Sequence, residues 1–185
     1  MTKLGADWQV GPDGIPTRRA ARVVLLSTDG KTLLFEGHDG DDPAHRWWFT
    51  CGGGIEPGES PRAAAARELA EETGLVVESA RLVGPVLERD ADFAFRNVLA
   101  RQIEDYYLVF LDGPARAIDT GGQTGSERNL VDRWRWFSAE QLVELAERET
   151  VYPLGLARYL RRWERGWDGV KLRVTERNSS HPPPN

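Results

Sequence analysis

The chain has 185 residues, one cysteine and a formal net charge of −5 at pH 7, so it is long enough for one domain with a sizeable core. The negative charge argues against bulk attraction to nucleic acid or an anionic membrane, so neither partner is expected and a bound anion must be held locally. No apolar run approaches a membrane span, and Cys51 alone excludes an intramolecular disulfide, so we expect a cytoplasmic protein.

The first third of the chain predicts an arm, a hairpin and a glycine-rich loop. Residues 1–18, rich in Gly, Pro, Asp and Thr, predict an irregular N-terminal arm. Two β-rich runs surround Asp29-Gly30 within 21–38, which is typical of a hairpin. A loop is expected over 39–45, a short aromatic strand over 46–50, and a loop at the three glycines 52–54.

The next element is a helix over 60–73 with recognisable signals at both ends. Ser60 suits the N-cap and Pro61 the first helical position. Gly74 suits the residue that ends the helix, because it adopts a left-handed backbone conformation readily.

Strands dominate the middle of the chain and helices its end. We expect mostly strand over 75–90, two strands in 93–113 with the second near 102–111, a loop over 113–130, a strand over 132–138, and helices over 139–149 and 153–167. The tail, 177–185, has the composition of a disordered segment. The predicted class is α+β, with one domain over 19–176.

Three carboxylates share one face of the helix over 60–73. At about 100° per residue, Glu68, Glu71 and Glu72 fall within an arc of roughly 100°. We expect the neighbouring apolar arc to pack on a sheet, with the carboxylates at its margin. Taken alone, this pattern is also typical of a solvated acidic face, since like charges four residues apart cost only a few tenths of a kcal/mol.

The spacing around these carboxylates favours a functional site. Gly53, Glu59, Arg67, Glu68, Leu69, Glu71, Glu72, Gly74 and Leu75 stand at the positions of one known signature, with every gap correct. Seven fixed letters match at a chosen position with a probability below about one in 10⁷. The segment resembles the signature of the Nudix hydrolase superfamily. The resemblance implies an α/β/α sandwich with a mixed central β-sheet and a hydrolase acting on a nucleoside diphosphate linked to another moiety.

The resemblance also assigns roles to these residues. Glu68, Glu71 and Glu72 would hold Mg²⁺ or Mn²⁺, for which hard oxygen ligands are suited. The carbonyl of Gly53 would be a further ligand. Arg67 would orient the glutamates, and Glu59 would lie near the metals or pair with Arg67.

The general base is open between two glutamates. Glu68 belongs to the signature, whereas Glu127 lies in the small, polar loop before the strand over 132–138. Glu127 is equally compatible with a surface charge in that loop.

The substrate contacts rest on weaker signals. Trp48 is a candidate for stacking on a base, and Arg46 and Arg101 for contacting phosphate. The alternatives are core packing for the tryptophan and solvated ion pairs for the arginines. No signal of a particular subfamily is present. We therefore expect a small nucleotide as the substrate, with a nucleoside triphosphate as the first choice. We also expect that the protein can form a homodimer.

Two other functions remain as alternatives. Cys51 stands where the family commonly has proline; it either packs in the core or performs nucleophilic chemistry, as in an enzyme like the isopentenyl diphosphate isomerases. The other alternative is a non-catalytic module that binds a nucleotide. The intact set of Arg67, Glu68, Glu71 and Glu72 argues against both.

Overall fold

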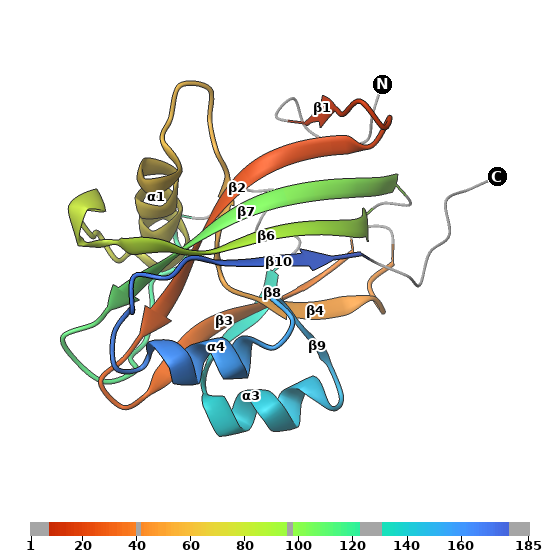
Figure 1. Cartoon of the computed structure of the whole chain (residues 1–185). Coiled ribbons are helices and arrows are strands. Elements are labelled where there is room, and N and C mark those ends of the chain that lie inside the picture. Colours follow the sequence, from red (N-terminus) through yellow and green to blue (C-terminus); the bar gives the residue numbers. More distant parts are fainter. Residues whose placement is uncertain (1–7, 40–41, 96–97, 123–130, 178–185) are drawn as a thin grey trace.

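The computed structural model describes residues 8–39, 42–95, 98–122 and 131–177, and its strands form two mixed sheets (Figure 1). The larger sheet has the order β1 (Gln9–Val10), β2 (Pro16–Leu26), β7 (Val98–Phe110), β6 (Val83–Phe95), β10 (Leu172–Glu176), with β5 (Cys51–Gly54) paired to β2. The smaller has the order β8 (Val131–Ser138), β3 (Lys31–His38), β4 (Arg46–Phe49), β9 (Thr150–Val151). The α-helices are α1 (Pro61–Thr73), α3 (Ala139–Ala146) and α4 (Leu156–Trp163).

The helices lie on opposite sides of the strands because the side chains of β2 alternate between two core clusters. Val23 and Leu25 pack in the cluster that contains Leu69 of α1. Val24 and Leu26 pack in the cluster that contains the buried residues of α3 and α4. A strand directs successive side chains to opposite faces, so α1 covers one side and α3 with α4 the other (Figure 1). The α+β class and the layered sandwich are as predicted, with the strands divided between two sheets.

Helix α1 has the predicted ends. The side chain of Ser60 accepts a hydrogen bond from the backbone N–H of Ala63, and Pro61 is the first residue. Gly74 has a φ of 70° and donates its N–H to the carbonyl of Ala70. Both ends of the helix are therefore fixed by local chemistry.

The glycines at 52–54 form a strand, where the sequence predicted a loop. They belong to β5, which pairs antiparallel with β2 and places Gly53 opposite Ala21. Pairing with a neighbouring strand has overridden the low strand preference of glycine. The glycine segment is therefore held in place along its length.

Other boundaries also differ from the prediction. Residues 16–18, assigned to the arm, belong to β2, and the strand expected from 75 begins only at Val83, after a 3₁₀ turn at Ser79–Arg81. β7 begins at Val98 rather than near 102, α4 is shorter than 153–167, and β10 was not predicted. The expected tail lies outside the described residues after Arg177. No helix in the described ranges is long and apolar enough to cross a membrane.

Candidate active site

Arg67 lies at the centre of the carboxylate cluster. Its guanidinium donates to both oxygens of Glu59, at 3.1 and 3.0 Å, and to the carbonyl of Gly54 at 3.0 Å. It also donates to Oε1 of Glu68 at 2.7 Å and to Oε2 of Glu71 at 3.2 Å. Donating these hydrogen bonds, first to Glu59 and then to Glu68, raises the pKa of Arg67, and the bond from Arg67 lowers the pKa of Glu59. Arg67 thus joins α1, the turn that carries Glu59, and β5.

Two of the three carboxylates are buried, although the sequence predicted them at the margin of the helix. The exposed fractions of Glu68 and Glu72 are 5% and 4%, whereas the side chain of Glu71 is 40% exposed. The glycines of β5 make this burial possible because they leave room above α1. A Cβ built on Gly53 would lie 2.7 Å from the carboxylate of Glu68.

Glu72 is held by the backbone of β5. Its Oε2 accepts a hydrogen bond of 2.7 Å from the backbone N–H of Gly52. Burial raises the pKa of Glu72 to about 7, although hydrogen bonds with Cys51 and Gly52 act in the opposite direction. Near neutral pH, this carboxyl group is therefore divided between its protonated and ionised forms.

Cys51 has the environment of a packing residue. Its side chain is completely buried, and burial, followed by the charge of Glu72, raises the pKa of its thiol well above the usual range. A buried, protonated thiol is a poor nucleophile. The packing interpretation of Cys51 is therefore favoured over nucleophilic chemistry.

The donor set fits a hard divalent cation. Glu68, Glu71 and Glu72 offer carboxylate oxygens, the ligands that Mg²⁺ and Mn²⁺ prefer, and Gly53 leaves the space above Glu68 that a Cβ would fill. Within the described residues, no three His, Cys, Asp or Glu side chains already converge as metal ligands. The hydrogen bonds explain this arrangement, since Arg67 binds Glu68 and Glu71 while Glu72 faces Gly52.

The structure places Trp48 in the core, which corrects its assignment as a substrate contact. Trp48 is 2% exposed, and its ring meets that of Phe137 edge-on at 5.0 Å. Its Nε1 donates to Glu149 at 2.7 Å. No open face of this indole is left for a base.

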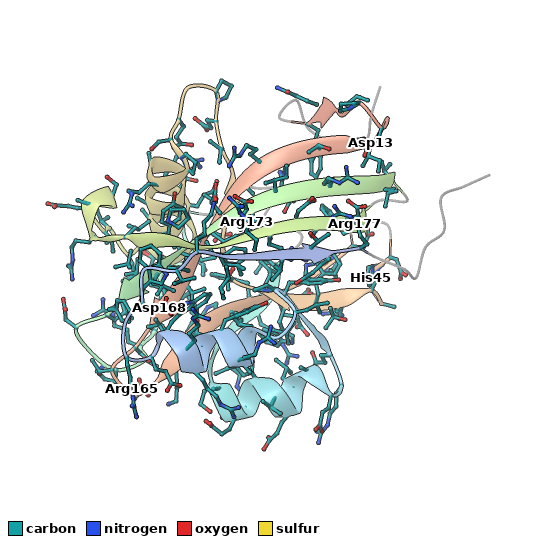
Figure 2. All side chains as sticks on the ribbon, in the orientation of Figure 1. Asp13, His45, Arg165, Asp168, Arg173 and Arg177 are labelled. Atoms are coloured by element: carbon teal, nitrogen blue, oxygen red, sulfur yellow. The ribbon has the colours of Figure 1, made fainter. Side chains whose placement is uncertain are left out.

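The two candidate arginines are engaged in ion pairs. Arg46 contacts Asp132 at 2.7 Å. Arg101 contacts Asp92 at 2.7 Å and Asp13 at 2.6 Å, and Asp13 lies at the opposite end of the sheet from α1 (Figure 2). These contacts favour the alternative of ion pairs for both arginines over a phosphate contact. Glu127 lies outside the described residues.

One arginine that touches the site was not predicted from the sequence. Arg22 of β2 donates to the carbonyl of Gly52 at 2.6 Å. The available signal was a charged residue inside the apolar run from Ala20 to Leu26. Its contact with Gly52 depends on the pairing of β2 with β5, which residue spacing does not reveal.

The adjacent glycines of β5 predict two different phenotypes. Gly53→Ala is expected to lower turnover about tenfold or more with little change in the melting temperature, because the new methyl group displaces only the flexible end of Glu68. Gly52→Ala is expected to destabilise the fold. At Gly52, φ is 128° and a Cβ would lie 2.1 Å from the backbone oxygen of Ala21. Thermal melts and turnover measured on both variants check this, and equal melting temperatures would contradict it.

The raised pKa of Glu72 predicts how stability depends on pH in the metal-free chain. Because the folded pKa of about 7 exceeds the ordinary value of 4.5, the folded state binds more protons between these values. Stability therefore falls as pH rises through this window, by up to about 3 kcal/mol. Denaturant unfolding with a chelator at pH 5 and pH 8 measures the loss. Glu72→Gln should reduce it, and an equal loss in this variant would contradict the assignment.

The protein has an α+β fold that carries acidic residues on a helix beside a glycine strand. The family model of the NUDIX domain matches residues 16–157. The chain therefore belongs to the Nudix family, and the match begins three residues before the domain start predicted at 19.

Curated relatives agree with this membership, and a solved structure agrees with the fold. The chain is 29% identical over 158 residues to an RNA pyrophosphohydrolase of Bartonella quintana, covering 75% of this chain and 86% of that protein. It is 30% identical over 144 residues to an RNA pyrophosphohydrolase of Cereibacter sphaeroides, covering 72% and 83%. The MutT protein of Bacillus halodurans has the same fold, with a TM-score of 0.56, 16% identity and coverage of 88% and 91%.

Proposed function

We propose that this chain, a Nudix-type pyrophosphohydrolase, hydrolyses the diphosphate linkage of a small nucleotide, with a nucleoside triphosphate as the preferred substrate, and requires Mg²⁺ or Mn²⁺. The observation that carries the proposal is the set of carboxylates ordered by Arg67 on α1. The family membership supports the reaction class.

The residues of the site would have different roles in binding the cation. Glu68, Glu71 and Glu72 would hold the cation, with the carbonyl of Gly53 as a further oxygen donor. The bound cation would offset phosphate charge and lower the pKa of a bound water. Arg67 would keep Glu68 and Glu71 in position through the hydrogen bonds described above, with its own charge balanced by Glu59.

The base that accepts the proton of the attacking water remains a choice between Glu68 and Glu127. The variant that loses the acidic limb of the pH–rate profile identifies the base, because this limb reports a carboxylate that must be ionised. If Glu127→Gln keeps that limb, the assignment passes to Glu68.

A second candidate substrate is the 5′ end of an RNA. It is favoured by the relatives that are named RNA pyrophosphohydrolases and match most of their length. This candidate differs from the expectation that nucleic acid is not a partner, which rested on the net charge of −5. Net charge describes bulk attraction, whereas a single 5′ end needs only a local site.

A substrate panel separates the two candidates. Nucleoside triphosphates, nucleotide sugars and a short RNA with a 5′-triphosphate are incubated with the chain and Mg²⁺ or Mn²⁺, and released phosphate and pyrophosphate are measured. Faster release from free nucleotides supports the first candidate, and release from RNA alone supports the second. No release from any substrate with either metal would contradict both.

A further inference from the structure

Arg22 of β2 connects the site to a charged network on the neighbouring strands β7 and β6. Its side chain is 12% exposed, and its Nη1 donates to the carbonyl of Gly52 at 2.6 Å. The N–H of the same glycine donates to Glu72. One residue of β5 is therefore bonded to Arg22 through its oxygen and to the carboxylate through its nitrogen.

The direction of the Arg22 guanidinium is fixed by Glu104. Nε of Arg22 donates to Oε1 of Glu104 at 3.0 Å. The other oxygen of Glu104 accepts hydrogen bonds from Arg89 at 2.7 Å and from the hydroxyl of Tyr106 at 2.8 Å. Glu104 is 1% exposed. A buried carboxylate with both oxygens bonded has little freedom to turn, so the fork of Arg22 stays aimed at Gly52.

The contact between Arg22 and Gly52 lies within the paired register of β2 and β5. Arg22 of β2 lies opposite Gly52 of β5, and Ala21 lies opposite Gly53. The three glycines of β5 have no side chains to pack, so this part of the strand is held by its pairing with β2. The hydrogen bond from the charged Arg22 to the carbonyl of Gly52 therefore restrains the position of β5, which the glycines, lacking side chains, cannot do.

We propose that Arg22 is a positioning residue that holds β5 against α1, so that Gly52 keeps its hydrogen bond to Glu72 and Gly53 stays beside Glu68. This inference rests on the proposed function, because it assigns Arg22 a part in holding the cation through these glutamates. The competing role is that of a counter-ion that only neutralises Glu104.

Two variants separate these roles, with Mn²⁺ alone as the probe. Arg22→Lys keeps the positive charge beside Glu104 but replaces the rigid fork by a single ammonium group. The double variant Arg22→Met with Glu104→Gln removes both charges, so no unpaired charge is left to destabilise the fold. Arg89 keeps its other partner, Glu176, at 2.6 Å. Arg19→Met is the matched control, since this arginine lies on the same strand with a side chain that is 58% exposed.

The measurements are the dissociation constant of Mn²⁺ from its electron paramagnetic resonance signal, the melting temperature, and kcat and KM for the substrate that the panel identifies. We expect both Arg22 variants to raise the Mn²⁺ dissociation constant about 10- to 100-fold, as the loss of residues that orient metal ligands does. We also expect kcat to fall with KM nearly unchanged. The Arg19 control should keep the Mn²⁺ affinity and the kcat of the wild type, although the loss of its ion pair with the buried Asp105 is expected to lower the melting temperature.

The possible failures are distinguishable. Wild-type Mn²⁺ affinity in either Arg22 variant would overturn the inference and leave the proposed function standing. A wild-type chain that neither binds Mn²⁺ nor hydrolyses any substrate of the panel would overturn the proposed function and this inference with it.

Discussion

Replacing Glu68 or Glu72 by glutamine is expected to lower turnover by about 10²-fold or more. Each change keeps the shape of the side chain but removes a negative charge that would hold the cation and help it activate water. The fold should survive, because Glu68 and Glu72 are buried on α1 and the amide of glutamine costs less to bury than an ionised carboxylate.

The control is Glu78→Gln, the same change at an exposed position outside α1. Its turnover should stay within about twofold of the wild type, since surface substitutions away from special features do little. Turnover is measured at saturating Mg²⁺ and again at saturating Mn²⁺, with melting temperatures in parallel. Near-wild-type turnover in Glu72→Gln with either metal would rule out its assignment as a ligand.

Arg67→Lys is expected to lower turnover about 10- to 100-fold although the positive charge is retained. The guanidinium of Arg67 donates hydrogen bonds to four groups at once: Glu59, Glu68, Glu71 and the carbonyl of Gly54. An ammonium group has three donors and no planar fork, so it cannot reproduce this pattern. The glutamates would then lose their common orientation.

Arg62→Lys provides the comparison for this change. Arg62 lies on the same helix and donates to the backbone carbonyls of Leu82 and Gly84, away from the glutamates. We expect its variant to affect the melting temperature more than turnover. If Arg67→Lys retained full turnover, the guanidinium geometry would be irrelevant to the site and the role of Arg67 would reduce to its charge.

Local signals made helix α1 predictable. Ser60, Pro61 and Gly74 act on backbone groups a few residues away, so their effect can be read without knowing the rest of the chain. Asp29-Gly30 identified the turn between β2 and β3 for the same reason, and Gly30 has a φ of 72°. The predicted hairpin was wrong, because β2 and β3 pair with other strands and belong to different sheets.

Elements whose stability depends on a distant partner were predicted less well. The glycines of β5 have no strand preference of their own and became a strand through β2. β10 forms a parallel pair with β6, more than 70 residues earlier in the sequence, from Leu172 opposite Leu87 to Glu176 opposite Ala91. For Trp48 the sequence left stacking on a base and core packing as alternatives, and the structure places it in the core.

The sequence by itself determined the residue types of the site, their spacing on one helix and the family to which the chain belongs, because a helical repeat converts spacing directly into a shared face. Only the tertiary structure decided that Glu68 and Glu72 are buried, that Gly52 binds Glu72 and that Arg22 reaches Gly52 from a different strand. Burial and contacts between strands depend on which segments meet in space. The rise in the pKa of Glu72 follows from that burial, so it belongs to the fold rather than to the motif.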